Sequence, residues 1–382
     1  MFSSRLKLDL ARNPLSRLIE EKRVAGAKVL DLTESNPTRA GLIYPGAEIL
    51  AALSDASALR YDPTPNGLLS ARETVSQYYA ERNRHVPPSR ILLTASTSEA
   101  YAYLFKLLTD PGDEVLVPRP SYPLFEYLAA MESVNVRQYP LRYDGAWHID
   151  FEALESALTN RTRVIVVVNP NNPTGSFLSV EAGQRLEEIA MRRDLVILSD
   201  EVFSDYAFGE ARAHPFSGIA PVFSMSGLSK IAGLPQMKLG WIVVDGPGCG
   251  EALDRLEWIA DTFLSVSAAV QIGLPKLLDL ARGVQQQIRE RTAANLKLLR
   301  ERVTNSPLNA LNVEGGWYAT LQVPRTRSEE EWALALLRDH DVLVQPGFFY
   351  DFESEAFLVL SLLTEPAAFA EGLRRIMEFA AS

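Results

Sequence analysis

The chain of 382 residues contains little of what metal sites, disulfide scaffolds and membrane anchors require. A single cysteine, Cys249, excludes an intrachain disulfide and a thiolate metal cluster. The histidines show no ligand spacing, so we expect no metal site. No apolar run approaches the ~18 residues of a membrane span, and residues 1–13 lack the apolar core of a signal peptide. We therefore expect a cytoplasmic protein that binds no membrane.

The net charge of −10 argues against a nucleic-acid backbone as a partner, because such a partner needs a basic surface. The composition, 47% hydrophobic and 23% charged, is that of an ordinary globular protein. The length favours two domains.

The order of apolar and helical stretches predicts the fold class. Residues 91–244 alternate short β-rich runs with helical stretches, and continuous Val/Ile runs are typical of parallel strands buried on both faces. Residues 251–264, 266–282 and 284–304 are predicted as three separate helices, and an α+β pattern follows them. We expect an α/β protein with a large domain at 46–283 and a smaller α+β domain at 1–45 and 284–382.

Three polar segments each follow a short apolar run. They contain Asn172 in a turn of Asn and Pro, Asp200 before Glu201, and Lys230 at the end of Ser-Gly-Leu-Ser-Lys. Ligands of open α/β sheets bind at the carboxyl ends of the strands, so an amide, a carboxylate and an amine are expected to converge there. That set suits an aldehyde cofactor with a heterocyclic nitrogen.

Each of these side chains has a distinct expected role. Lys230 is the candidate Schiff-base residue, and an uncharged amine requires a pKa lowered by burial or by nearby cations. An ionised Asp200 holds a pyridine nitrogen protonated and so makes the ring an electron sink. Asn172 either forms the turn or donates a hydrogen bond to the phenolic oxygen of the cofactor.

Two further segments have the residues of a cofactor site. Thr94 to Ala100 joins a strand to a helix, and its hydroxyls and free N–H groups make an anion site, although Ser and Thr also begin many helices as caps. Tyr122, between two prolines of the segment 118–123, offers a ring that stacks on a planar cofactor or serves as half-buried packing.

These segments together resemble a fold-type I pyridoxal-phosphate enzyme of the class I/II aminotransferase family. The resemblance runs from about Leu30 to the C-terminus, and five segments occur in the family's order. It implies a large domain with a mostly parallel seven-stranded sheet and pyridoxal 5'-phosphate as cofactor. It also implies a homodimer with shared active sites.

The resemblance assigns a role to each matching residue. Lys230 forms the Schiff base and then moves the substrate proton, Asp200 pairs with the pyridine nitrogen, and Asn172 with the ring oxygen. Tyr122 stacks on the ring, and Tyr61 contacts the cofactor phosphate in the active site of the neighbouring subunit. The cofactor phosphate is assigned to Ser96, Thr97, Ser229 and Lys238, and the substrate side to the segment of Ser35, Asn36 and Pro37.

Three positions near the cofactor depart from the family pattern. Phe203 stands where a tyrosine usually donates to the ring oxygen, so we expect a higher pKa for the Schiff base than in relatives with that tyrosine. Lys238 replaces a phosphate arginine and supplies charge without a bidentate fork. Gly227 replaces a phosphate-binding serine. The last two changes predict weaker cofactor retention.

The fourth departure concerns the substrate carboxylate. The family places an arginine two residues before Ser361, and here Val359 occupies that position. Three explanations remain open: another cation, with Arg39 as the leading candidate, a substrate without a carboxylate at that place, or an alignment shifted by a residue or two.

The predicted function is an aminotransferase of amino-acid metabolism that moves an amino group from an amino acid to a 2-oxo acid through Lys230. A pyridoxal-phosphate lyase or cyclase, such as a carbon–sulfur β-lyase, is the alternative on the same fold. A non-catalytic pyridoxal-phosphate-binding protein is a remote third. The sequence names neither the amino donor nor the acceptor.

Overall fold

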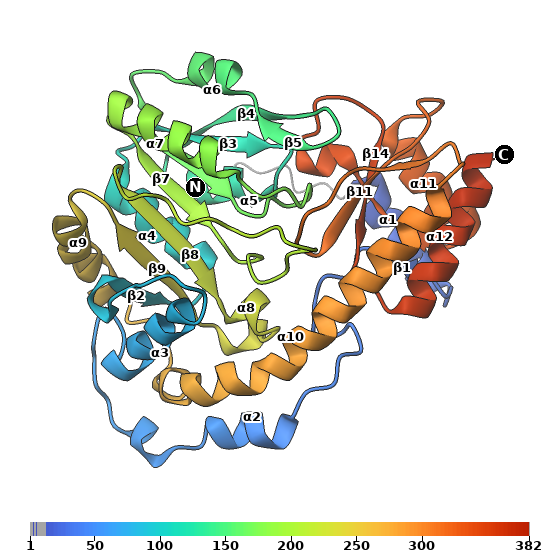
Figure 1. Cartoon of the computed structure of the whole chain (residues 1–382). Coiled ribbons are helices and arrows are strands. Elements are labelled where there is room, and N and C mark those ends of the chain that lie inside the picture. Colours follow the sequence, from blue (N-terminus) through green and yellow to red (C-terminus); the bar gives the residue numbers. More distant parts are fainter. Residues whose placement is uncertain (1–2, 4, 6–12, 382) are drawn as a thin grey trace.

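The structure is a computed structural model that describes residues 3, 5 and 13–381. A large sheet surrounded by helices lies at one end of the molecule and a smaller sheet at the other, and the long helix α10 runs between them (Figure 1). The large sheet consists of β2 (Ile91–Thr94), β3 (Glu114–Arg119), β4 (Asn135–Tyr143), β5 (Trp147–Ile149), β6 (Thr162–Val168), β7 (Val196–Asp200), β8 (Val222–Gly227) and β9 (Gly240–Asp245).

The large sheet has the strand order β2-β9-β8-β7-β6-β3-β4-β5. The strands β8, β7, β6, β3 and β4 run parallel to one another, whereas β9 is antiparallel to both of its neighbours and β5 is antiparallel to β4. The mostly parallel α/β sheet predicted from the sequence is confirmed, and the short hairpin strand β5 is added to the seven strands expected.

Both faces of this sheet are buried, which explains the continuous apolar runs of the sequence. In β6, Val164 and Val166 pack on one side, while Ile165 and Val167 pack on the other. Helices therefore cover both faces. The helices of this part are α3 (Leu69–Ala80), α4 (Thr97–Leu108), α5 (Leu124–Met131), α6 (Phe151–Ala157), α7 (Val180–Arg193), α8 (Leu228–Ile231) and α9 (Cys249–Asp261), with α2 (Gly46–Ala52) outside them.

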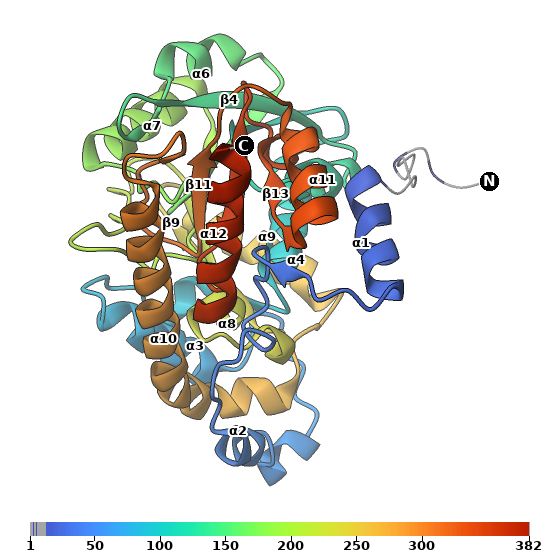
Figure 2. The same cartoon turned by 90° about the vertical axis from the view of Figure 1, so that its right-hand side faces the viewer.

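The smaller sheet has the order β10-β11-β14-β13, and β1 pairs with β12 beside it. The helices α1 and α11 pack together, and α12 packs on the second half of α10 (Figure 2). The elements are α1 (Pro14–Val24), β1 (Leu30–Asp31), β10 (Asn309–Ala310), β11 (Tyr318–Gln322), α11 (Glu329–His340), β12 (Val342–Leu343), β13 (Gln345–Pro346), β14 (Phe357–Ser361) and α12 (Pro366–Ala381).

One prediction about the helices is wrong. The stretches 266–282 and 284–304 do not form two helices, because α10 (Ala268–Val303) continues through Pro275 and Gly283. Its first half packs on the large sheet and its second half on the small one, so tertiary burial on both sides outweighs the low helix propensity of these two residues. The division at 283/284 therefore falls within a continuous helix and remains a proposal.

Two observations concern the described residues as a whole. None of their helices combines the length and apolarity needed to cross a bilayer. Nor do they bring three or more His, Cys, Asp or Glu side chains together in a way that would hold a metal ion.

Candidate active site

The three predicted segments leave neighbouring parallel strands at the same edge of the large sheet. Val168 at the end of β6 lies opposite Asp200 at the end of β7, and Asp200 lies opposite Met225 in β8. Asn172 follows the first of these strands and Lys230 the last, so all three residues leave the sheet at the same edge. Parallel pairing thus brings together residues that are up to 58 positions apart in the sequence.

Lys230 lies on α8, a helix of one turn that begins where β8 ends. Its amine is 5.1 Å from the ring centre of Trp317 and 5.6 Å from that of Phe203. Burial lowers the pKa of Lys230 from 10.5 to about 8, and the charge of Asp200 opposes this shift. About one amine in ten is therefore uncharged at pH 7, and nucleophilic attack on an aldehyde requires this uncharged form.

Asp200 is held by two uncharged donors. The Tyr101 hydroxyl donates to Oδ2 at 3.0 Å and the Val202 N–H to Oδ1 at 3.2 Å. Burial raises the pKa of Asp200 to about 6, against the effect of these hydrogen bonds and of Lys230. A buried carboxylate of this kind attracts a cationic partner, and a protonated pyridine nitrogen has the required charge.

Tyr101 was not predicted as a site residue. Tyr101 belongs to the apolar face of α4, where it packs on Phe105 and Phe125, so its place in the sequence indicates packing alone. A tyrosine within an apolar stripe usually finds a polar partner for its hydroxyl, and this was the only available signal.

The turn after β6 contains one satisfied and one unsatisfied asparagine. Asn171 donates to Pro120 O at 3.0 Å and to Thr174 Oγ1 at 2.9 Å, so it stabilises the turn. The Oδ1 atom of Asn172 is buried and has no hydrogen-bond partner. Buried polar atoms are rarely left unpaired, so the amide of Asn172 is available to a ligand. With its N–H2 group turned toward the ligand, this amide can donate to the ring oxygen of a pyridoxal phosphate.

Two of the segments predicted to bind the phosphate approach each other at Gly240. Ser96 is the N-cap of α4, and its Oγ accepts the Glu99 N–H at 3.2 Å, which leaves its own hydrogen free to donate. A Cβ placed on Gly240 would lie 3.1 Å from Ser226 O and 3.2 Å from the Ser96 carbonyl carbon. The start of α4, which includes Thr97, and the end of β8, which leads into Ser229, therefore lie side by side.

The backbone explains Gly227, one of the departures noted in the sequence. A Cβ on Gly227 would come within 2.7 Å of Gly240 Cα and 2.9 Å of Leu239 O, so no serine fits at this place without movement of β9. Lys238 is exposed and has φ 52°, in the left-handed region that non-glycine residues seldom adopt. Such outliers concentrate at functional sites.

The remaining predicted residues lie nearer the surface. Tyr122 and Tyr61 are exposed, the latter to 79%. Asn36 Oδ1 accepts from the N–H and the hydroxyl of Thr38 at 3.0 and 2.7 Å, so its side chain closes a local turn. Arg39 is exposed on this turn, next to the buried Ala40.

Val359 is enclosed in an aromatic cluster beside the lysine. It is 1% exposed and packs in the same cluster as Phe203, Trp317, Tyr318 and Tyr350. Ala40, from the turn that carries Arg39, belongs to this cluster too. The position at which the resemblance places an arginine is therefore filled by an apolar side chain.

Comparison with known proteins gives a consistent result. The family model described as aminotransferase class I and II matches residues 27–376. Tyrosine aminotransferase of Mus musculus is 27% identical, over 96% of this chain and 85% of that protein. The glutamate-pyruvate aminotransferase AlaA of Haemophilus influenzae is 26% identical, over 92% and 90%. A solved aminotransferase from Escherichia coli has a TM-score of 0.87 at 25% identity, over 100% of this chain and 98% of that one.

Proposed function

Because the chain belongs to the class I and II aminotransferase family and is a pyridoxal-phosphate-dependent enzyme that transfers amino groups, we propose that Lys230 binds the cofactor covalently and then moves the substrate proton. The predictions of family, cofactor and activity are confirmed. The observation that carries the proposal for Lys230 is its position near the half-buried Asp200, at the edge where β6, β7 and β8 end, together with its lowered pKa.

Pyridoxal phosphate supplies an electron-withdrawing ring when it is bound. Asp200 is proposed to keep the ring nitrogen protonated, and the amide N–H2 group of Asn172 to donate a hydrogen bond to the ring oxygen. Lys230, uncharged in part at neutral pH, is proposed to accept a proton from the substrate and return it. The proposed ligands of the ring face and the phosphate are Tyr122, Ser96, Thr97, Ser229, Lys238 and, from a neighbouring subunit, Tyr61.

Arg39 is the proposed partner of the substrate α-carboxylate. Two observations support it: Val359 occupies the usual place of the arginine within an apolar cluster, and Ala40, next to Arg39, packs in that same cluster. Asn36, which closes the same turn, is proposed to line the substrate side with Asn172.

A homodimer is proposed from the surface around Tyr61. Leu59 and Tyr61 are 91% and 79% exposed and line a cavity of about 490 Å³ together with Leu264 and Ile272. Exposed apolar side chains of this size are typical of an interface. We retain the expectations of a cytoplasmic enzyme in amino-acid biosynthesis that binds neither nucleic acid nor membrane.

The first experiment is reductive labelling. Purified holoenzyme is treated with borohydride, and we expect the cofactor to be fixed on Lys230 in peptide mass spectrometry. Label on another lysine would remove Lys230 from the mechanism. Asp200→Ala should bind the cofactor poorly and lose nearly all turnover, and near-normal turnover would exclude the assigned role.

The reaction type is tested by incubating the holoenzyme with an amino donor alone. A transaminase accumulates the pyridoxamine form, whereas a β-lyase releases ammonia and pyruvate without an acceptor. We expect the pyridoxamine form, and release of ammonia and pyruvate would favour the lyase.

The carboxylate site is tested by Arg39→Ala. We expect the KM for amino acids to rise far more than the KM for simple amines, because only the former present a carboxylate. Arg302→Ala, an exposed arginine at the end of α10, is the matched control and should change neither constant. Equal effects of Arg39→Ala on both substrate types would end this assignment.

A further inference from the structure

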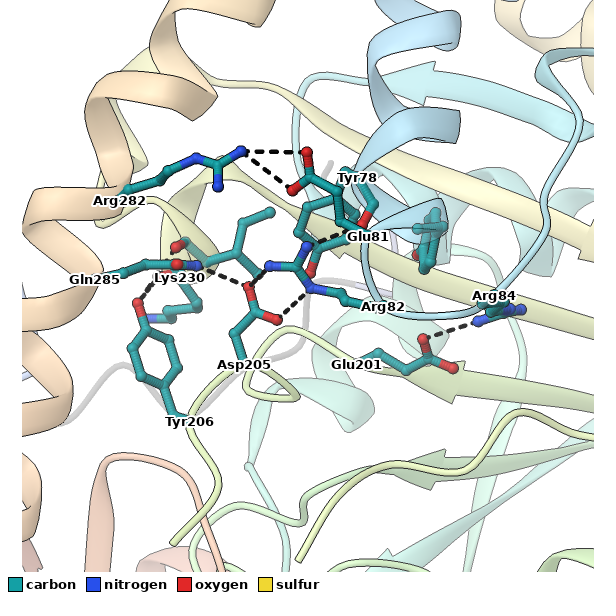
Figure 3. A network of polar contacts seen from close by, with 12 residues as sticks. Tyr78, Glu81, Arg82, Arg84, Glu201, Asp205, Tyr206, Lys230, Arg282 and Gln285 are labelled. Atoms are coloured by element: carbon teal, nitrogen blue, oxygen red, sulfur yellow. Dashed lines mark hydrogen bonds and ion pairs between the residues drawn. The ribbon is translucent and has the colours of Figure 1, made fainter. Parts of the chain in front are cut away.

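The segment from Asp200 to Tyr206 links the two proposed reactive residues, Asp200 and Lys230. It begins at Asp200, the proposed partner of the pyridine nitrogen. At its other end the Tyr206 hydroxyl donates to Lys230 O at 2.7 Å (Figure 3). The same hydroxyl is 3.4 Å from Ile231 O. Seven residues thus connect the carboxylate to the backbone of the lysine.

The hydrogen bond from Tyr206 matters because α8 is short. A helix of four residues cannot satisfy its own carbonyls, so each needs an outside donor. Lys230 O accepts from the Gly233 N–H at 3.1 Å and from the buried hydroxyl of Tyr206. Without the hydroxyl, one of these two restraints on the backbone of Lys230 is lost.

Tyr206 is in turn fixed through the residue before it. Arg82 donates from Nε and Nη2 to the two carboxylate oxygens of Asp205, each at 2.7 Å, and Gln285 donates to Oδ2 at 2.7 Å. The Asp205 side chain is only 5% exposed. Figure 3 shows Asp205 between Arg82 of the turn after α3 and Gln285 of α10. A bidentate pair whose carboxylate is buried restricts geometry more than a fully exposed ion pair does.

The other end of the segment is held from the same turn. Arg84 pairs with Glu201 at 3.2 Å, and Ser199 Oγ donates to the second oxygen of Glu201 at 3.0 Å. Arg82 and Arg84 therefore clamp the segment on both sides, immediately after Asp200 and immediately before Tyr206.

We propose that Tyr206 is a positioning residue that holds the backbone of Lys230 in register with Asp200, and that the Arg82–Asp205 pair holds Tyr206 in place. The inference rests on the proposed role of Lys230. Tyr206 is assigned no contact with substrate or cofactor, so its effect passes through the position of the lysine amine.

The test compares Tyr206→Phe with Tyr139→Phe. Tyr139 is an equally buried tyrosine whose hydroxyl donates to the backbone at Val166 O, 2.9 Å away, in the core of the large sheet. Apoenzyme is mixed with pyridoxal phosphate, and the covalent attachment at Lys230 is followed over time by absorbance and by borohydride trapping. The kcat, the KM for the amino donor and the thermal midpoint are measured for each reconstituted variant.

We expect Tyr206→Phe to slow attachment and to lower kcat, each by about five- to tenfold, the factor that one buried hydrogen bond represents. The KM should stay within about twofold, because the hydroxyl does not touch substrate. Tyr139→Phe should lower the thermal midpoint to a similar degree but leave the attachment rate and kcat unchanged. Equal attachment rates for wild type and Tyr206→Phe, or equal slowing by both variants, would overturn the proposal.

A second variant covers the possibility that Tyr206→Phe does not fold. Arg82→Gln should slow attachment in the same direction, whereas Arg163→Gln, which removes an exposed arginine paired with Asp113 at 3.1 Å, should not. An unchanged attachment rate in Arg82→Gln contradicts the anchoring role. Failure of the wild type to attach cofactor at Lys230 would instead refute the proposed function itself, so the two failures are distinguishable.

Discussion

The rate at which the cofactor attaches to the apoenzyme should rise with pH over a lower range than for an ordinary lysine, because the pKa of Lys230 is lowered. Burial lowers the pKa of Lys230 from 10.5 to about 8. At pH 7 about one amine in ten is then uncharged, about 300 times the fraction of an unperturbed lysine, because each pKa unit changes the ratio tenfold. We therefore expect the attachment rate to rise with pH and to reach half of its maximum near pH 8, well below the pH that an ordinary lysine requires.

The assay is a short pulse of pyridoxal phosphate on apoenzyme, quenched with borohydride, with the Lys230 peptide quantified by mass spectrometry. Lys297, whose side chain is 78% exposed, is followed in the same samples as the control for the reagent's own pH dependence. Asp200→Asn should move the midpoint of Lys230 to lower pH, because the charge of Asp200 raises the lysine pKa in the wild type. A midpoint above about 10, or a shift to higher pH in Asp200→Asn, would refute the reasoning.

Three further predictions follow from single contacts. Phe203→Tyr should lower the pH midpoint of the bound cofactor's absorbance by about one to two units, because a phenol donor stabilises the ionised ring oxygen; an unchanged spectrophotometric titration would contradict this. Gly227→Ser should lower the thermal midpoint by several degrees, in line with an overpacking cost of about 1–3 kcal/mol. Gly283→Ser is the control and should not lower it, because a Cβ added at Gly283 would have no atom within 4 Å. Leu59→Glu, at a side chain 91% exposed in the surface around Tyr61, should shift the proposed homodimer to monomer in sedimentation, and an unaltered dimer would place the interface elsewhere.

The arrangement of the strand ends was predictable because it depends on local patterns. Short apolar runs followed by Asn172, Asp200 and Lys230 indicate buried parallel strands, and parallel pairing places their carboxyl ends together. The N-cap role of Ser96 follows from its position before a helix with an acidic first turn. These inferences do not depend on contacts between residues that are far apart in the sequence.

Contacts between distant residues were not predictable. Tyr101 reaches Asp200 from 99 positions away, and Arg82 reaches Asp205 from 123 positions away. Each side chain has an ordinary local explanation, as helix packing or as a solvated charge, and only the tertiary fold gives it a partner. The length of α10 was missed for a related reason, since burial against two sheets overrides a glycine and a proline.

The two reactive side chains both reduce the stability of the apoprotein at neutral pH. The pKa of Asp200 is raised to about 6, so the cost of ionising this group in the folded state grows above its unfolded pKa and is full once the pH exceeds about 6. The pKa of Lys230 is lowered to about 8, so the cost of protonating the amine in the folded state grows below its unfolded pKa and is full once the pH falls below about 8. Between these two pH values both costs are present. A ligand that supplies a cation beside Asp200 and takes up the lysine amine in a covalent bond removes both penalties at once. In the proposed binding mode, part of the affinity for the cofactor therefore comes from relief of the unfavourable burial of these two groups, which offsets the weaker phosphate site expected from Lys238 and Gly227.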